Sequence, residues 1–131
     1  MTILRSSVFT SLFFMPLLSL AGSVEPSPKD ACVAMDDKSC GPSQVHAFSA
    51  VDLNADGEKE IIFAWSGGSC GEQHWVFTRR NEKWKQIGNW CGMDGGAYSV
   101  LKTKHKGFND IDTNFGIIRF NGKEYPDTTK K

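Results

Sequence analysis

Residues 61–65, Ile-Ile-Phe-Ala-Trp, form the stretch of this 131-residue chain that decides the fold. A short, uninterrupted apolar run is typical of a central β-strand. Before it, residues 45–51 alternate, which predicts a strand with Val45, Ala47, Ser49 and Val51 on one face. After it, residues 74–79 and 83–88 predict a hairpin that turns near Arg80 and Asn81. We therefore expect the fold to be built around an antiparallel sheet.

The rest of the chain adds more strands and little helix. Four further short strands are expected, at residues 98–103, 109–113, 115–120 and 123–125. Asn121-Gly122 separates the last two, and this dipeptide is the strongest short-range hairpin signal. Residues 29–37 predict one or two helical turns. The expected fold is a mostly β, sandwich-like domain of seven or eight short antiparallel strands with one short N-terminal helix.

The first residues have the layout of a secretory signal peptide, over residues 1–21. Arg5 supplies the positive start, and residues 8–20 form an apolar core that ends in small side chains at Ala21. A membrane anchor is the alternative, but this run is shorter than the roughly 20 residues that span a bilayer. We expect cleavage after Ala21, a single β-rich domain over residues 22–131, and a periplasmic or secreted location with no membrane attachment.

The charge of the chain is balanced. Lys plus Arg number 15 and Asp plus Glu number 15, so the formal net charge is zero. Binding to nucleic acids or anionic membranes through bulk electrostatics requires an excess of positive charge. We therefore expect neither nucleic acid nor membrane as a partner.

The chain contains four cysteines, Cys32, Cys40, Cys70 and Cys91. An even number in an exported chain indicates two disulfides, and four cysteines allow three pairings. In the predicted hairpin Cys70 faces Cys91, at a separation close to disulfide reach. This favours Cys70–Cys91 and leaves Cys32–Cys40 by elimination. A zinc site is disfavoured because there is no C-x-x-C pair and the three histidines are scattered.

The sharpest motif is the loop Asp-Leu-Asn-Ala-Asp-Gly-Glu-Lys-Glu at residues 52–60. Oxygen-bearing side chains recur at alternate positions, and Gly57 permits the sharp turn that a calcium loop needs. Position 12 of the loop is Phe63 rather than Glu, and strands flank the loop, so it is not an EF-hand. We expect a structural calcium ion with ligands from Asp52, Asn54, Asp56, Glu58 (through its carbonyl) and Glu60.

This strand–loop–strand segment, residues 47–65, resembles the FG-GAP/VCBS repeats of integrin-type β-propellers. The resemblance rests on Asp52, Asn54, Asp56, Gly57 and the acid–apolar sequence Glu60-Ile61-Ile62. It implies calcium coordination by Asp52, Asn54, Asp56 and Glu60, although the family usually has Asp at the last position. A single copy excludes a closed propeller, which needs several repeats. The alternative is an Asx-rich turn that binds nothing.

One stretch matches a catalytic pattern without its context. Residues 67–71 fit G-x-S-x-G, and Asp94 and His105 follow in the order of an α/β-hydrolase triad. That motif requires a strand-to-helix elbow, whereas a strand follows here and Cys70 is expected in a disulfide. We expect no catalytic residues and no enzymatic activity.

What remains is a recognition surface on two glycine-rich loops, residues 66–71 and 91–96, tied together by the expected disulfide. The candidate partner-binding residues are Ser69, Glu72, Met93 and Asp94. We expect a small exported, non-enzymatic binding protein of the inhibitor or immunity type, which blocks a protein partner such as a cell-wall hydrolase. This is an analogy of general build. A calcium-dependent binding module for carbohydrate or protein is the alternative.

Overall fold

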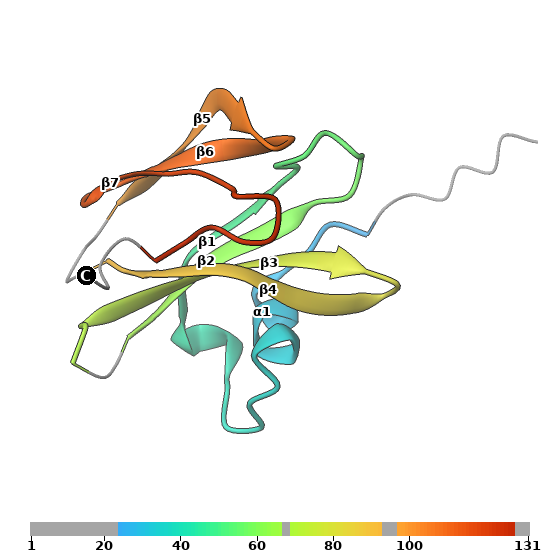
Figure 1. Ribbon diagram of the computed structural model, residues 1–131. Coiled ribbons are helices and arrows are strands. Elements are labelled where there is room, and N and C mark those ends of the chain that lie inside the picture. The colour runs from blue at the N-terminus through green and yellow to red at the C-terminus, as the bar shows by residue number, and fades with distance from the viewer. Residues whose placement is uncertain (1–23, 67–68, 93–96, 128–131) are drawn as a thin grey trace, which may run out of the picture.

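The computed structural model describes residues 24–66, 69–92 and 97–127, which form two antiparallel sheets and one α-helix. In the first sheet, four strands follow one another in chain order: β1 (Val45–Val51), β2 (Glu60–Ser66), β3 (Glu72–Arg80) and β4 (Lys83–Cys91). The second contains β5 (Tyr98–His105), β6 (Phe108–Thr113) and β7 (Gly116–Ile118) (Figure 1). Helix α1 (Pro28–Met35) and a 3-10 turn (Pro42–Gln44) precede β1. The prediction of a mostly β, antiparallel fold is confirmed.

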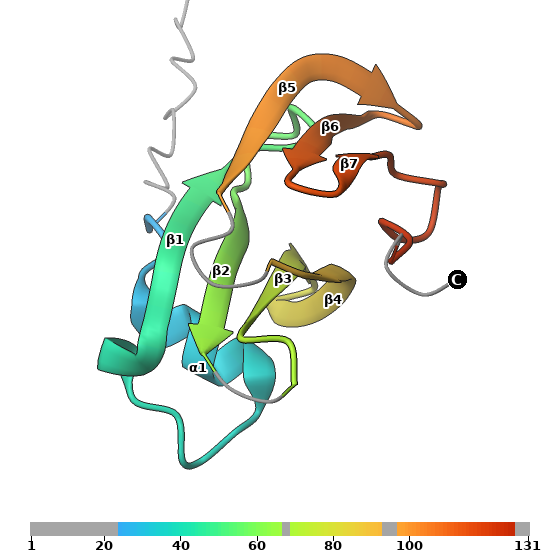
Figure 2. The ribbon, with the colours of Figure 1, turned by 90° about the vertical axis from the view of Figure 1, so that its left-hand side faces the viewer.

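The elements form three layers, with α1 on one face of the four-stranded sheet and the three-stranded sheet on the other (Figure 2). Side chains alternate along β2, so Ile61 and Phe63 pack with Ala31 on the helix side. Ile62 packs on the opposite side, in the cluster that includes Ile111 of β6. This double burial explains why residues 61–65 are a continuous apolar run rather than an alternating one.

Strand β1 does not alternate as predicted. Its register shifts between His46 and Ser49, and Ala47 has a φ of 45°. Val45 and Phe48 consequently pack on the helix side, whereas Val51 packs on the other side. The prediction of one continuous face was wrong because a β-bulge reverses the alternation within the strand.

The β3–β4 hairpin is present, but its predicted register was wrong. The turn lies at Asn81 and Glu82, which have φ values of 50° and 64°, rather than at residues 80 and 81. Phe77 faces Gln86 instead of Trp84, and a second shift follows between Val76 and Phe77. Two consecutive positive φ values are typical of the type I′ turn, whose twist matches that of the strands it joins.

Both expected disulfides are confirmed. The Cα atoms are 5.3 Å apart in Cys32–Cys40 and 5.6 Å apart in Cys70–Cys91. Cys70 does not face Cys91 in the ladder, where Gln73 takes that place. Cys70 precedes β3 in the chain. It lies in a turn in which the backbone N–H of Glu72 donates to the carbonyl of Cys70 (3.1 Å). Disulfides indicate an oxidising environment outside the cytoplasm.

The C-terminal segment also departs from prediction. Residues 123–125 do not form a hairpin with residues 115–120. Instead, the chain turns at residues 121–124 and returns to the four-stranded sheet, where Tyr125 makes a parallel bridge with Gly88. The Tyr125 backbone N–H donates to the carbonyl of Ile87 (2.6 Å). The Asn-Gly turn therefore connects the two sheets rather than two neighbouring strands.

Among the described residues, no helix is long and apolar enough to cross a membrane. The predicted signal peptide, residues 1–21, lies outside the described residues.

Candidate functional site

The β1–β2 loop gathers three of its predicted ligands around its own backbone. Asp52 accepts bonds from the N–H groups of Asp56 (3.2 Å) and Gly57 (2.9 Å). Asn54 accepts from the Asp56 N–H (3.1 Å), and its amide donates to the Asp56 carboxylate (3.0 Å). Asp56 in turn accepts from the N–H of Glu58 (2.8 Å). The side-chain oxygens of Asp52, Asn54 and Asp56 therefore line one tight turn.

Glu60, the last predicted ligand, lies buried beneath this loop with 1% of its surface exposed. One carboxylate oxygen accepts from the N–H of Leu53 (2.8 Å) and the other from the hydroxyl of Thr78 (2.9 Å). Burial, aided by the negative charges of Asp56 and Asp52, raises the pKa of Glu60 against the lowering effect of these two bonds. In this arrangement Glu60 fastens the loop to β3.

The described residues contain no group of three or more His, Cys, Asp or Glu side chains placed to hold a metal ion. The carbonyl of Glu58, the remaining predicted ligand, belongs to an exposed residue of the loop. Calcium binding by residues 52–60 stays a prediction.

Two of the predicted partner-binding residues, Ser69 and Glu72, lie at the opposite end of the four-stranded sheet from this loop, because successive connections of a meander alternate between its ends (Figure 1). We call this region the disulfide end and define it by Ser69, Cys70, Glu72, Cys91 and Gly92. Ser69 is exposed and Glu72 is half-buried. The Gly92 N–H donates to the carbonyl of Glu72 (2.8 Å), so the bridge and this bond together join β3 to the end of β4. Met93 and Asp94 lie outside the described residues.

The three-stranded sheet adds apolar side chains next to the disulfide end. The side-chain amide of Asn114 donates to the carbonyl of Gly92 (3.0 Å) and ties the β6–β7 turn to this region. The next residue, Phe115, is 47% exposed, and Ile117 on β7 is 41% exposed. Both were expected within a strand at residues 115–120, and their exposure was not predicted. The signal that could have found them is the turn pattern Asn114-Phe115-Gly116, since Gly116 has a φ of 113°.

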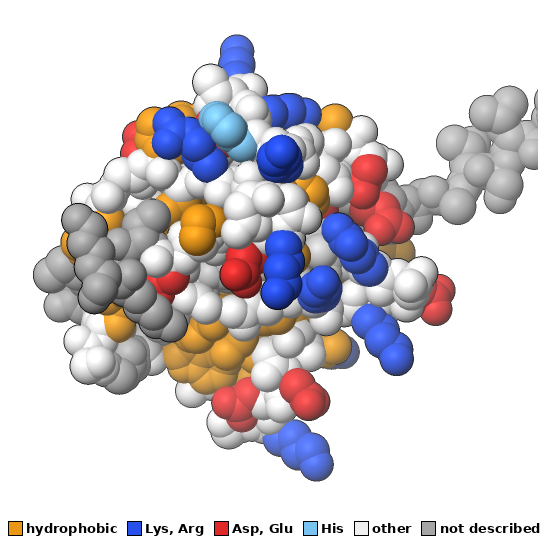
Figure 3. Space-filling view, viewed as in Figure 1, with side chains coloured by type: hydrophobic (Ala, Val, Ile, Leu, Met, Phe, Trp, Pro, Cys, Tyr) orange, Lys and Arg blue, Asp and Glu red, His pale blue; other side chains and the backbone are white. Residues whose placement is uncertain are grey.

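Of the residues in the hydrolase-like pattern, Ser69 and His105 lie in different parts of the fold, and Asp94 lies outside the described residues. His105 Nδ1 lies 2.7 Å from the carboxylate of Asp110, which also accepts from the Thr103 hydroxyl (2.7 Å). These residues belong to the three-stranded sheet, over which basic side chains gather (Figure 3), whereas Ser69 belongs to the disulfide end. Burial opposes ionisation of Asp110, but the two hydrogen bonds and the charges of His105 and Arg119 lower its pKa overall.

His74 is an unusual residue below the disulfide end. It is fully buried, and neither ring nitrogen has a hydrogen-bond partner. Its ring stacks on Trp90 with centroids 4.9 Å apart and meets Tyr98 edge-on at 5.7 Å. Burial lowers the pKa of His74, against a smaller opposing effect from Glu72, so the imidazole is held neutral.

The arrangement as a whole therefore offers two candidate surfaces at opposite ends of one sheet, an acidic loop and a disulfide-braced end with exposed apolar side chains. Comparison with protein families, with curated proteins and with solved structures found no match for this chain.

Proposed function

We propose that this chain is a small exported, non-enzymatic protein that binds and blocks a protein partner, such as a cell-wall hydrolase, in the periplasm or after secretion. The observation that carries the proposal is the composition of one end of the molecule. There, a disulfide and the Gly92–Glu72 bond hold two connections together. Asn114 ties the β6–β7 turn to Gly92, and Phe115 and Ile117, which follow Asn114 in the chain, are exposed.

Such a surface suits recognition for a physical reason. Binding costs free energy wherever mobile groups become ordered, and a braced surface reduces that cost. Exposed aromatic and aliphatic side chains supply the apolar contact area that dominates most protein interfaces. Ser69 and Glu72 supply polar groups at the margin, where an interface keeps its hydrogen bonds.

The test measures inhibition directly. The oxidised protein is added to a panel of peptidoglycan hydrolases of the lysozyme and amidase classes, and the rate of turbidity loss of a peptidoglycan suspension is followed. We expect stoichiometric inhibition of one class. The double variant Phe115→Ser/Ile117→Ser should raise the inhibitor concentration for half-inhibition at least about tenfold, as expected for loss of an apolar hot spot.

Val24→Ser is the matched control, because Val24 is an 86% exposed aliphatic residue beside Glu58 and Lys59 of the β1–β2 loop, at the opposite end of the sheet. It should leave inhibition unchanged, and melting curves establish that all variants are folded. Failure to inhibit either hydrolase class would contradict the proposed target. Equal losses in the double variant and in Val24→Ser would contradict the proposed surface.

A calcium-dependent binding module is the second candidate function, favoured by the convergence of oxygens from Asp52, Asn54 and Asp56 in one turn. In this proposal the ion is structural and stiffens the β1–β2 loop, which then contacts carbohydrate or protein. Calcium at about 100 times its Kd would add about 2.7 kcal/mol to the free energy of unfolding.

Thermal melting with calcium and with a chelator tests this second candidate. We expect a rise of several degrees with calcium in the wild type and none in Asp52→Ala. Glu82→Ala, in the β3–β4 turn, removes one exposed carboxylate outside the loop and should keep the full shift. An identical melting temperature with calcium and chelator would rule the candidate out.

A further inference from the structure

A groove beside the disulfide end is lined by Met35, Asp37, Trp65, Ser66 and Trp75 and has a volume of about 210 Å³. We call it the indole groove. It exists because α1 ends at Met35, so the helix covers Phe63 and Phe77 but leaves Trp65 and Trp75 half-buried. Figure 3 shows hydrophobic side chains gathered below β4, next to acidic ones.

The rim of the groove carries negative charge in an arrangement that is unfavourable within the molecule itself. Asp36 and Asp37 follow directly on the C-terminal end of α1, whose last turn contains no basic residue. The C-terminal end of a helix already bears partial negative charge, which cations stabilise and carboxylates do not. Lys29 and Lys38 line a neighbouring hollow with both carboxylates, but among the described residues neither forms an ion pair with them. A cation from outside the chain would therefore relieve this repulsion.

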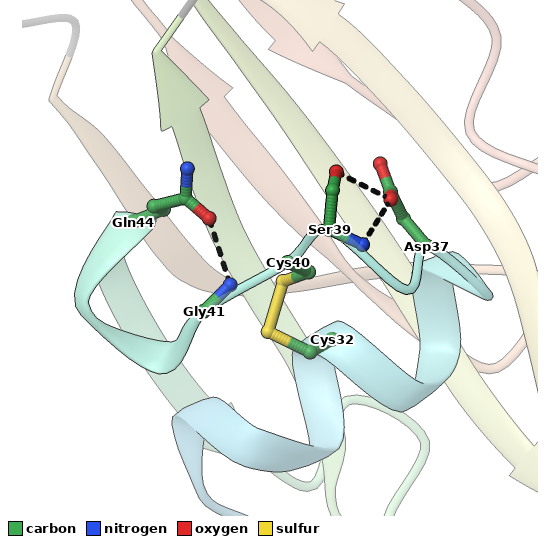
Figure 4. Close-up of a disulfide and its surroundings, with 6 residues drawn as sticks. All are labelled: Cys32, Asp37, Ser39, Cys40, Gly41 and Gln44. Atoms are coloured by element: carbon green, nitrogen blue, oxygen red, sulfur yellow. Dashed lines mark hydrogen bonds between the residues drawn. A yellow bond between two sulfur atoms is a disulfide. The ribbon is translucent and has the colours of Figure 1, made fainter.

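Asp37 is held in place at this rim. Its carboxylate accepts from the N–H (2.8 Å) and the hydroxyl (2.7 Å) of Ser39, and both bonds lower the pKa of Asp37. The Cys32–Cys40 disulfide ties the same loop back to the helix (Figure 4). An ionised acceptor is therefore fixed beside two indole rings.

On the same face of the four-stranded sheet, at its far end, another tryptophan ring already contacts a cationic side chain. There the guanidinium of Arg79 lies 5.9 Å from the ring centroid of Trp84, within cation–π range. Within residues 24–66, 69–92 and 97–127, no Lys or Arg makes this contact with Trp65 or Trp75, and none pairs with Asp37. The indole groove therefore presents two indole rings and the carboxylate of Asp37, the groups that bind a cation.

We propose that the indole groove binds a cationic side chain of the partner, arginine in preference to lysine. A planar guanidinium stacks on indole faces and presents several N–H donors to a carboxylate, whereas an ammonium is more strongly hydrated. This inference rests on the proposed function for its partner protein. The groove also adjoins the disulfide end, since Ser66 pairs with Glu72 across β2 and β3.

The experiment uses the tryptophan side chains as four separate reporters. Indole N–H signals of the uniformly ¹⁵N-labelled, oxidised protein are followed during titration with N-acetyl-arginine methylamide, up to about 50 mM because one side chain binds weakly. The neutral citrulline analogue is titrated in parallel, and a chitin tetrasaccharide tests stacking of sugar rings instead. We expect saturable shifts of the Trp65 and Trp75 signals with the arginine derivative alone, with Trp84 and Trp90 unmoved.

Two charge variants complete the test. Asp37→Asn should weaken binding of the arginine derivative about fivefold, the loss expected for an exposed ion pair. Asp36→Asn removes the same charge one residue away, outside the groove lining, and should have at most half that effect. Equal shifts with the citrulline derivative, shifts with the sugar alone, or no shift of Trp65 and Trp75 would each overturn the proposal. None of these readouts requires a hydrolase, so failure here is distinguishable from failure of the proposed function.

Discussion

At the scale of single residues, His74 stands out because a neutral imidazole has one donor and one acceptor, and here both lack partners in a buried site. Leaving buried polar atoms unpaired costs free energy. Stacking on Trp90 and the edge contact with Tyr98 offset part of that unfavourable free energy. The lowered pKa follows from the same burial, since protonation would place a charge in an apolar environment.

This burial predicts a pH-dependent stability. The pKa of His74 is lower in the folded state than the ordinary value near 6.5, so the unfolded chain binds the proton first as the pH falls. The His74 contribution is therefore fully present above about pH 6.5 and decreases below it, by at most about 1.4 kcal/mol per pH unit. Urea unfolding between pH 5 and 8 measures it.

The variant His74→Phe keeps an aromatic ring against Trp90 and cannot be protonated. Its free energy of unfolding should vary less between pH 5 and 6.5 than that of the wild type. His46→Asn, which removes an exposed histidine, is the control and should keep the wild-type slope. Parallel curves for the wild type and His74→Phe would show that His74 is not the titrating group.

The packing of the His74 ring requires a glycine at position 92. A Cβ built on Gly92 overlaps Cε1 and Nδ1 of the His74 ring. Gly92→Ala should therefore lower the free energy of unfolding by about 2 kcal/mol or more, as in other overpacked sites. At Gly41 the nearest atom to a built Cβ is 3.6 Å away, so Gly41→Ala should cost far less. Similar losses in the two variants, measured by chemical unfolding, would refute the packing argument.

At the scale of elements, the β1–β2 loop depends on Glu60 as much as on its own turn residues. Glu60 provides the acceptors for the Leu53 N–H and the Thr78 hydroxyl, and both donors lie in buried residues. A loop that is rich in Asx bonds holds its local shape, but its position on the sheet is set by this carboxylate. The motif identified the loop, and the packing beneath it decides where the loop lies.

Removing this carboxylate should loosen the loop and destabilise the protein. Glu60→Ala leaves two buried donors unpaired, so we expect a loss of about 3 kcal/mol in urea unfolding at pH 7. Glu60→Gln retains one acceptor and should lose less. Because burial raises the pKa of Glu60, the part of its contribution that depends on protonation is fully present below the ordinary glutamate pKa and is lost as the pH rises through the raised value.

The difference in stability between the wild type and Glu60→Gln should therefore shrink as the pH rises above about 4.3, the ordinary glutamate pKa. Glu82→Ala, which removes an exposed carboxylate, is the control and should change stability little. If Glu60→Ala is as stable as Glu82→Ala, the carboxylate does not fasten the loop.

At the scale of the whole molecule, Tyr125 joins the two sheets. Its backbone bonds to Ile87 of the four-stranded sheet, and its hydroxyl donates to the carbonyl of Asn109 in the other (2.6 Å). Its ring packs edge-on against Phe120, with centroids 5.3 Å apart. It also lies against Gly88, where a built Cβ would come within 2.8 Å of the Tyr125 Cβ. The C-terminal segment thus closes the core between the sheets.

Truncating this ring should separate the effects of packing and hydrogen bonding. Tyr125→Ala removes a buried aromatic side chain, so we expect a loss of about 3–5 kcal/mol in guanidinium unfolding. Tyr125→Phe keeps the ring and loses only the bond to Asn109, which predicts a loss of about 1 kcal/mol. Comparable losses in the two variants would mean that the ring contributes little to the core.

The sequence determined the local features of this protein because each depends on neighbouring residues. The apolar run at residues 61–65 is a central strand, the alternating and aromatic runs around it are strands, and the four cysteines form two disulfides. Strand periodicity and turn chemistry are properties of a few consecutive side chains. The pairing of Cys70 with Cys91 was predicted correctly from a register that was wrong. A turn just before β3 brings Cys70 close to the end of β4.

Only the tertiary structure decided the register of β3 against β4, the bulge in β1 and the return of residues 121–125 to the other sheet. It also decided that His74 is buried without partners and that Glu60 lies beneath its loop. Each of these depends on contacts between residues far apart in the chain. A turn displaced by one residue shifts every facing pair, and a side chain is buried only when another layer covers it.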